Sequence, residues 1–280
     1  MSVAEKPITA TPINPSRASA ARGSVLSAVT ENIPALVFLV LLLVLWEVYV
    51  RAFDVHAFIL PAPSAIAEVI AAQYPNLFRH TLVTTSEIAL GFAIGNAAAI
   101  VGAIVIANSR LAERIFYPLI IASQTIPKIA IAPLFLIWLG TGLAPKVVIT
   151  AILCFFPTLV NTVQGLRTVD PNAVDLLRLV AASRTQLFLK LQFPNALPYV
   201  FAGLKISIAL AVIGAIVAEW IGASQGLGYL VMYGGQTLRT DLTFAALAFI
   251  AVLGMVLYLA VVLVERLVSW EPADTPIGGL

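Results

Sequence analysis

The stretch IPALVFLVLLLVLWEVYV, residues 33–50, decides the class of fold. It is almost wholly apolar, and its one charged residue is Glu47. An apolar helix of about 20 residues is long enough to cross a hydrocarbon layer of about 30 Å. The run ends in bulky residues rather than in the small-residue cleavage site of a secretory signal, so we expect a retained membrane helix.

The composition of the whole chain agrees with this reading. Of its 280 residues, 60% are hydrophobic and 11% are charged, against about 45–50% and about 25% in soluble domains. The net charge of +2 provides no broad field for nucleic acid, and we expect no such partner. Cys154 is the one cysteine of the sequence, which excludes an internal disulfide and a cysteine-based metal cluster.

Apolar runs recur along the chain and predict an all-α polytopic membrane protein with about six spans. We expect a transmembrane domain over 31–270, a disordered N-terminal tail over 1–30 and a short C-terminal tail over 271–280. The predicted spans are Ile33 to Val50, Thr84 to Ile106, Ile115 to Leu139, Pro145 to Leu166, Leu197 to Ile221 and Thr243 to Val264.

The distribution of Lys and Arg predicts the orientation of these spans. Cytoplasmic segments carry an excess of basic residues, and an even number of spans puts both termini on one side. With the termini inside, ten basic residues are cytoplasmic, namely Lys6, Arg17, Arg22, Arg110, Arg114, Arg167, Arg178, Arg184, Lys190 and Arg266. Four remain outside: Arg51, Arg79, Lys146 and Arg239. We therefore expect both tails to be cytoplasmic.

Two local signals lie in and before the second span. Gly91 and Gly95 form a G-x-x-x-G pair, a spacing that lets another helix approach closely, although it is common in membrane helices. The preceding stretch LPAPSAIAEVIAAQ, residues 60–73, predicts a short amphipathic helix on the outer surface with Ser64 as its cap.

The loop over 168–194, between spans four and five, combines charges with helix signals. Asp170 followed by Pro171 is typical of a helix start. Ser183 can cap a second helix, RTQLFLKLQF, which we expect to end before Pro194. Two short helices joined at Ala181 and Ala182 cannot cross a bilayer, so they are expected at the cytoplasmic surface. The alternative is a basic loop that only fixes topology.

A proline-flanked break is predicted in the third span. Lys128 follows Pro127, and Pro133 lies five residues on, so the helix is expected to open there and free backbone carbonyls. Lys128, with Gln124 and Thr125, is then a candidate for lining a conduit for a polar or anionic solute.

The other ionisable residues of the spans leave alternatives open. Lys128 could instead snorkel, or pair with Glu87 or Glu219 inside the bundle. Glu219 is kept as a pathway candidate, although Glu87 and Glu219 both lie where they could be interfacial. Lys205 is expected to snorkel at the cytoplasmic end of span five.

Enzyme chemistry finds little support in the sequence. No G-x-x-x-x-G-K-[ST] phosphate loop occurs, so the chain is not expected to supply energy from ATP itself. An intramembrane enzyme would need a nucleophile with a base or a metal cluster. His56 and His80 form no H-E-x-x-H pattern, and we expect no metal site, no catalytic residue and no cofactor. A secondary transporter or channel without an ATPase partner stays as the alternative.

The loop over 168–194 resembles a pattern found in permease subunits of ATP-binding-cassette importers. The pattern is E-A-A, three residues, G, nine residues, then I-x-L-P. Here the acidic position is Asp175, the paired alanines are Leu176 and Leu177, and the glycine is Ala181. The final proline of the pattern matches Pro194 in LQFP. These departures make the short motif weaker than the longer similarity around it.

That longer similarity is to permeases of the nitrate, sulfonate, taurine and pyrimidine-precursor group. Four segments resemble the group in order and spacing: ASQTIPKIAIAPLFLIWLGTGLAPK, AASRTQLFLKLQFPNALPYVFAGLKI, AEWIGASQGLGYL and RTDLTFAAL. The resemblance implies that the loop docks on a cytoplasmic ATPase and transmits its closure to the spans. It assigns this coupling role to Asp175, Leu176, Leu177, Arg178, Ala181, Ala182, Ser183, Arg184 and Pro194.

The resemblance also implies partners and a location. We expect two ATPase subunits, a second permease copy (the same chain or a close relative), a periplasmic or lipid-anchored solute-binding protein, and membrane lipid. The location is the inner membrane of a bacterial cell. The solute is expected to be a small sulfonate, a nitrate-like anion or a pyrimidine-type heterocycle, and the sequence does not choose among them.

Overall fold

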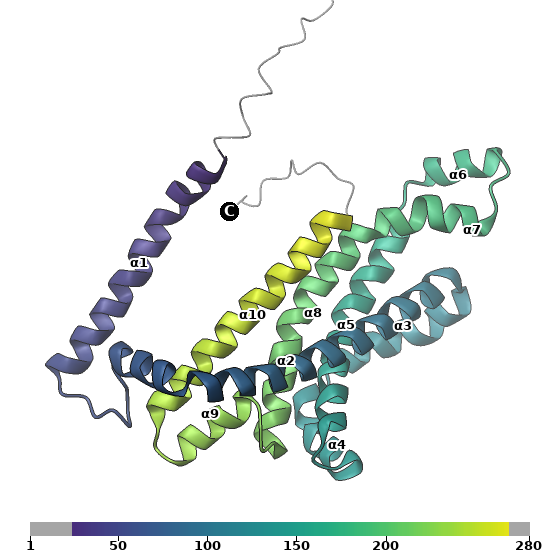
Figure 1. Ribbon diagram of the computed structural model, residues 1–280. Coiled ribbons are helices and arrows are strands. Elements are labelled where there is room, and N and C mark those ends of the chain that lie inside the picture. The colour runs from purple at the N-terminus through teal and green to yellow at the C-terminus, as the bar shows by residue number, and fades with distance from the viewer. Residues whose placement is uncertain (1–23, 269–280) are drawn as a thin grey trace, which may run out of the picture. The chain divides into compact units, whose positions relative to one another are not determined.

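The computed structural model describes residues 24–268, with side chains from residue 33 onward except those of Tyr117, Ile121 and Gln124. Every regular element in that range is a helix, which confirms the predicted all-α class (Figure 1). The helices are α1 (Ser24–Ala52), α2 (Pro63–Asn108), α3 (Arg110–Gln124), the 3₁₀ turn η2 (Lys128–Ile131), α4 (Ala132–Leu139), α5 (Leu143–Arg167), α6 (Pro171–Leu179), α7 (Arg184–Leu187), the π turn η3 (Phe188–Gln192), α8 (Phe193–Gly222), α9 (Leu227–Gln236) and α10 (Thr240–Val268).

Five of the described helices are long and apolar enough to cross a membrane, which matches five of the six predicted spans. They are Ile33–Ala52, Pro63–Asn108, Leu143–Arg167, Arg184–Gly222 and Thr240–Val268. The predicted third span, 115–139, is not one helix. It divides into α3, η2 and α4, because Pro127 has no N–H to donate and disfavours helical angles at the residue before it.

The chain divides into two compact units, Met1–Val55 and His56–Leu280. In the first unit, α1 begins at Ser24, so it takes in the last seven residues of the predicted tail over 1–30. Most of its apolar side chains from Leu36 to Leu45 are exposed, as expected of a helix whose surroundings are lipid. Residues 1–23 and 269–280, which hold most of the two predicted tails, lie outside the described part of the chain.

The second unit begins with α2, which is one helix of 46 residues. The predicted amphipathic helix over residues 60–73 is its first part, and the residue in the N-cap position is Ala62 rather than Ser64. The two parts meet at Gln73, whose φ of −112° and ψ of 16° depart from helical values. Pro75 explains this kink, because a proline inside a helix removes one backbone hydrogen bond and crowds the preceding turn.

The core of this unit is formed by α2, α5 and α8, with α5 packed extensively against both of the others. Gly91 and Gly95 make the close approach of α2 to α5 possible. A Cβ on Gly95 would lie 2.9 Å from the Cα of Ala151, and one on Gly91 would lie 2.6 Å from Cγ2 of Thr150. The predicted helix contact at the G-x-x-x-G pair is therefore confirmed, with α5 as its partner.

Polar side chains also join the three core helices. Thr158 of α5 donates to Oδ1 of Asn96 on α2 at 2.5 Å, and its hydroxyl lies 2.8 Å from that of Ser207 on α8. Ser207 in turn donates to the carbonyl of Cys154 at 2.8 Å. A buried hydroxyl or amide without a partner is costly, so these bonds fix how the three helices pack.

Candidate functional site

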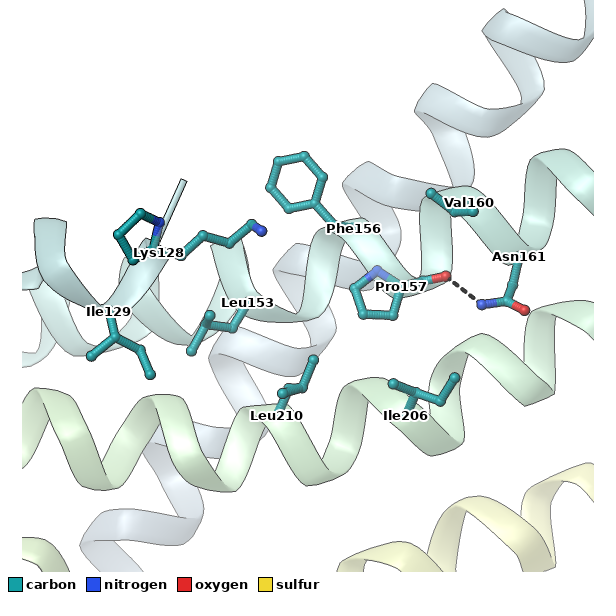
Figure 2. A pocket seen from close by; sticks show the side chains of 10 residues that line it. Lys128, Ile129, Leu153, Phe156, Pro157, Val160, Asn161, Ile206 and Leu210 are labelled. Carbon is teal, nitrogen blue, oxygen red and sulfur yellow. Dashed lines mark hydrogen bonds between the residues drawn. The ribbon is translucent and has the colours of Figure 1, made fainter. Parts of the chain in front are cut away.

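An open pocket of about 540 Å³ lies where η2 meets α5 and α8. Its lining is mainly apolar, and it includes one charged side chain, Lys128. In Figure 2 the Lys128 side chain extends from η2 toward the ring of Phe156 on α5, while Ile206 and Leu210 of α8 lie on the other side. We call this the Lys128 pocket.

The break in the third predicted span places Lys128 at this pocket. α3 ends at Gln124, and Pro127 precedes a single 3₁₀ turn that begins with Lys128. Pro133 then occupies the first turn of α4, where a missing N–H costs nothing. The predicted break is confirmed, and because of it the lysine belongs to a short turn rather than to a helix face.

Lys128 has an aromatic partner. Its Nζ lies 4.6 Å from the centroid of the Phe156 ring, within the range of a cation–π interaction. Among the described residues, no carboxylate lies within ion-pair distance of this ammonium group. Glu87 pairs instead with Lys146, at 2.5 Å. The alternative in which Lys128 pairs with Glu87 or Glu219 is therefore wrong.

The α5 wall of the pocket carries a second proline. Pro157 has no N–H to donate to the carbonyl of Leu153, so the helix lacks one backbone hydrogen bond beside the pocket. The amide of Asn161 donates to the carbonyl of Pro157 at 2.8 Å, the dashed line in Figure 2. The Asn161 side chain thus places a polar group on an otherwise apolar wall.

Of the other predicted pathway residues, Thr125 and Glu219 do not line this pocket. Thr125 caps the end of α3, and its hydroxyl donates to the carbonyl of Ala122 at 2.7 Å. The side chain of Gln124 lies outside the described part of the chain. Glu219 is only 1% exposed and lies in a separate buried cluster.

That cluster connects α2, α8 and the start of α9. Thr84 donates to Oε1 of Glu219 at 2.7 Å, and Oε2 of Glu219 accepts from the N–H of Gly228 at 2.5 Å. Thr84 also accepts from the N–H of Leu227 at 2.8 Å. Glu219 therefore holds the first turn of α9, whose N–H groups have no helical acceptors.

Glu87 and Glu219, for which the sequence allows an interfacial position, are both buried within the protein, at 1% exposure each. Lys205, which is expected to snorkel, forms an ion pair, because its Nζ lies 3.0 Å from both carboxylate oxygens of Glu265 on α10. The partner of Glu87 is Lys146, which the sequence does not predict. A signal was present, since both residues lie near the outer ends of their predicted spans and carry opposite charge.

The loop between α5 and α8 forms the two helices that its caps predict. Asp170 accepts from the N–H of Asn172 at 2.9 Å, and Pro171 opens α6. Ser183 accepts from the N–H of Gln186 at 3.2 Å, and the Gln186 side chain accepts from the N–H of Ser183 at 2.8 Å. This reciprocal pair is a capping box that begins α7.

The turn between the two helices explains the glycine position of the family pattern. Ala181 has a φ of 56°, in the left-handed region that glycine adopts without cost. The N–H of Ala181 donates to the carbonyl of Arg178 at 2.9 Å, and that of Ala182 to the carbonyl of Leu177 at 3.0 Å. These two bonds form a Schellman motif, which fixes the direction of the chain as it leaves α6. We call residues 171–187 the α6–α7 corner.

The corner exposes apolar side chains. Leu176 is 63% exposed, Leu179 84% and Val180 69%. Asp175 and Arg178 form an exposed ion pair at 3.3 Å on the same helix. An apolar patch on a short, well-capped helix is typical of a surface that a partner covers.

The second helix of the loop does not end before Pro194, as the sequence predicts. α7 continues through the π turn η3 into α8, so that 184–222 is one helix. The N–H of Phe193 donates to the carbonyl of Phe188, five residues back, and the widened turn accommodates Pro194 in the first turn of α8. The corner is therefore joined to a membrane span without an intervening loop.

Comparison with known proteins gives a consistent family. The family described as "Binding-protein-dependent transport system inner membrane component" matches residues 95–270, more than half of the chain. The riboflavin transport system permease protein RibX of Chloroflexus aurantiacus is 38% identical over 84% of this chain and 89% of its own. The formylaminopyrimidine transport permease protein ThiX of Halalkalibacterium halodurans is 36% identical over 85% and 95%. The putative aliphatic sulfonates transport permease protein SsuC of Bacillus subtilis is 32% identical over 82% and 84%.

A solved structure supports the fold. A chain from the crystal structure of an amino acid ABC transporter with histidines superposes with a TM-score of 0.56 at 18% identity. The match covers 71% of this chain and 94% of the other. At this identity the likeness concerns the arrangement of helices alone.

Proposed function

Because the chain belongs to the family of binding-protein-dependent transport system inner membrane components, we propose that its α6–α7 corner couples a cytoplasmic ATPase to the spans of an importer. The observation that carries the proposal is a rigid, exposed corner continuous with a membrane helix. Hydrogen bonds cap the start of each of its two helices, at Asp170 and in the Ser183 capping box. A fixed corner transmits a displacement that a flexible loop would absorb.

The docking surface proposed for the ATPase consists of the exposed side of this corner. Leu176 and Val180 provide apolar area, and Asp175 with Arg178 provides charges at its edge. The role extends to the residues that shape the turn and begin the next helix: Leu177, Ala181, Ala182, Ser183, Arg184 and Pro194. A patch of this kind, with an apolar centre and a polar rim, suits a protein partner.

The Lys128 pocket is proposed as part of the solute conduit. An ammonium group without a carboxylate partner attracts anions and electron-rich groups, and the Phe156 ring offers a flat apolar contact. Gln124 and Thr125 remain pathway candidates only because they lie close to Lys128 along the chain. Glu219 does not, because its carboxylate is occupied by Thr84 and Gly228.

The assembly follows from the family. An ATPase and a solute-binding protein are partners of such a permease. We propose two ATPase subunits, a second copy of this chain across the conduit and surrounding membrane lipid, with both termini in the cytoplasm. The orientation is supported by the ten basic residues that it places inside against four outside. Because the sequence contains no phosphate loop, the energy is assigned to the partner.

The solute is proposed to be small and either anionic or a flat heterocycle. The relatives are named for aliphatic sulfonates, a formylaminopyrimidine and riboflavin. The Lys128 pocket offers a contact for each class, with the ammonium group for an oxyanion and the Phe156 ring for a flat ring.

The coupling role is tested with Ala181→Glu. The position is exposed and Ala181 is already left-handed, so glutamate adds charge and bulk at the docking surface with little further backbone strain. In proteoliposomes with the ATPase and binding protein, we expect ATP-driven uptake to fall by about tenfold or more, while the amount of folded permease in the membrane stays unchanged.

Ala181→Gly is the matched control, because glycine favours the same φ and adds no side chain. It should retain full uptake. Normal uptake by Ala181→Glu would remove the corner from the coupling surface.

A further inference from the structure

A second pocket, of about 340 Å³, lies at the end of α8 away from the α6–α7 corner. The 30 residues of α8 separate the two places along the chain (Figure 1). The pocket is lined by α2 at and just after its kink, the turn before α9, α9 itself and the segment that leads into α10. Its polar lining residues include Gln73, Asn76, Arg79, Ser224, Tyr233 and Arg239. We call it the arginine pocket.

The charges of this pocket favour an anion. Among the described residues, no carboxylate lies within ion-pair distance of Arg79. Arg239 has only Asp241, at 3.7 Å, which is beyond hydrogen-bond length. Two guanidinium groups and one nearby carboxylate leave one positive charge in excess. The planar fork of arginine donors matches the oxygens of an oxyanion.

The pocket has a fixed floor. His80, Leu230 and Leu242 are 4%, 3% and 2% exposed. Nδ1 of His80 accepts from the N–H of Gly226 at 2.8 Å, and its ring stacks on Tyr229 with centroids 5.9 Å apart. Packing and this hydrogen bond therefore fix the floor of the pocket, whereas Arg79 and Arg239 are exposed side chains of its lining.

The volume and lining decide between kinds of ligand. A cavity of about 300–1,000 Å³ is the usual size for a small molecule. The two leucines of this lining, Leu230 and Leu242, are buried in its floor, so its exposed groups are mainly polar or charged. These features suit the oxyanion of a small water-soluble solute.

We propose that the arginine pocket binds a small oxyanion, such as the sulfonate or carboxylate group of a solute, at a site distinct from the Lys128 pocket. Among the described side chains, none lines both pockets. The outward position of the arginine pocket rests on the orientation proposed above, whereas its chemistry does not. In that orientation an anionic solute meets this pocket on the external side.

The experiment uses the full-length permease in lipid nanodiscs, with methanesulfonate as the probe and methanesulfonamide as its neutral counterpart. Isothermal titration calorimetry or ligand-observed NMR gives the dissociation constants. We expect methanesulfonate to bind, and Arg79→Gln and Arg239→Gln each to weaken it by about tenfold, since each removes a charge-assisted contact. Methanesulfonamide should bind to neither variant nor wild type.

Arg114→Gln is the matched control, an exposed arginine on α3 outside both pockets, and should leave binding unchanged. Thermal unfolding of each variant establishes that it is folded. Binding that persists in Arg79→Gln and Arg239→Gln, or no methanesulfonate binding to wild type, overturns the proposal. So does a result in which only the association of a solute-binding protein depends on Arg79, because the pocket is then a protein-docking contact.

The two proposals fail independently. If Lys128→Met lowers uptake and Arg79→Gln leaves methanesulfonate binding unchanged, the conduit role of the Lys128 pocket is supported and the anion site in the arginine pocket is contradicted. If methanesulfonate binding depends on Arg79 and Lys128→Met leaves uptake unchanged, the anion site in the arginine pocket is supported and the conduit role of the Lys128 pocket is contradicted.

Discussion

At the residue scale, two lysines differ in their surroundings: one is neutralised by a buried carboxylate, and the other contacts an aromatic ring. Lys146 is buried against the carboxylate of Glu87 at 2.5 Å, and removing either partner would leave a buried charge uncompensated. Lys128 lies over the Phe156 ring, and the described residues offer it no carboxylate partner. The charge of Lys146 is neutralised by its partner, whereas that of Lys128 is the one we propose to meet the solute.

Lys128→Met should therefore lower solute uptake more than it lowers the amount of permease in the membrane. Methionine keeps similar length and apolar contact with Phe156 but loses the charge. Loss of about 1–1.4 kcal/mol of electrostatic stabilisation corresponds to a five- to tenfold lower uptake rate. Initial rates in proteoliposomes, divided by permease content, measure this. Lys128→Arg keeps the charge and should retain most of the uptake, and equal rates in all three proteins would contradict a conduit role.

Gly95→Ala should destabilise the permease, because the added methyl group overlaps the backbone of Ala151 on α5. Overpacking of this kind costs about 1–3 kcal/mol, and the thermal unfolding temperature in detergent should fall. Gly254→Ala on α10 is the matched control, since its Cβ would meet nothing nearer than 3.9 Å. That variant should be neutral or slightly stabilising because alanine favours helices. A drop of the same size in both variants would contradict the close approach at Gly95.

At the scale of elements, the corner was largely predictable because caps and proline positions act locally. Asp170, Pro171 and Ser183 predict where α6 and α7 begin, and all three positions agree with the structure. The end of the second helix was not predictable in this way. Pro194 is a local signal to stop, and a π turn five residues long overrides it by letting Phe193 donate to Phe188. The sequence carries no simple mark of that turn.

Ser183→Ala should loosen the corner, because it removes one half of the capping box. Loss of an N-cap side chain costs about 1 kcal/mol of local helix stability. If the corner transmits ATPase closure, the ratio of solute transported to ATP hydrolysed should fall by about two- to fivefold, with hydrolysis itself retained. Ser183→Asp preserves an N-cap acceptor and serves as the comparison. An unchanged ratio in Ser183→Ala would mean that this cap plays no part in coupling.

At the scale of the whole molecule, length and apolar composition predict the class of protein and five of its spans. They do not predict which buried polar groups meet. Thr158, Asn96 and Ser207 come from three helices far apart in sequence, and only their packing brings them together. The same holds for Glu219 and Thr84, which are 135 residues apart. The Lys128 pocket was partly predictable, since its proline break is local, but its α5 and α8 walls were not.

The purified permease should hydrolyse no ATP, and its uptake of solute should depend on added ATPase subunits and ATP. The physical reason is that no loop in its sequence cradles a nucleotide phosphate. Phosphate release by the isolated chain, measured beside the reconstituted importer, tests this. Uptake that is driven by an ion gradient with no ATPase present would favour a secondary transporter instead.

The continuity of α7, η3 and α8 has a mechanical consequence. Residues 184–222 form one helical rod of about 60 Å, with no hinge of loop residues along it. A displacement at one end of such a rigid helix moves the other end in the same rigid-body rotation, so the two ends move together. Each residue of an α-helix turns the chain by about 100°. Deleting one residue from the π turn would therefore rotate the α6–α7 corner about the axis of α8 and would also remove the widened turn that accommodates Pro194.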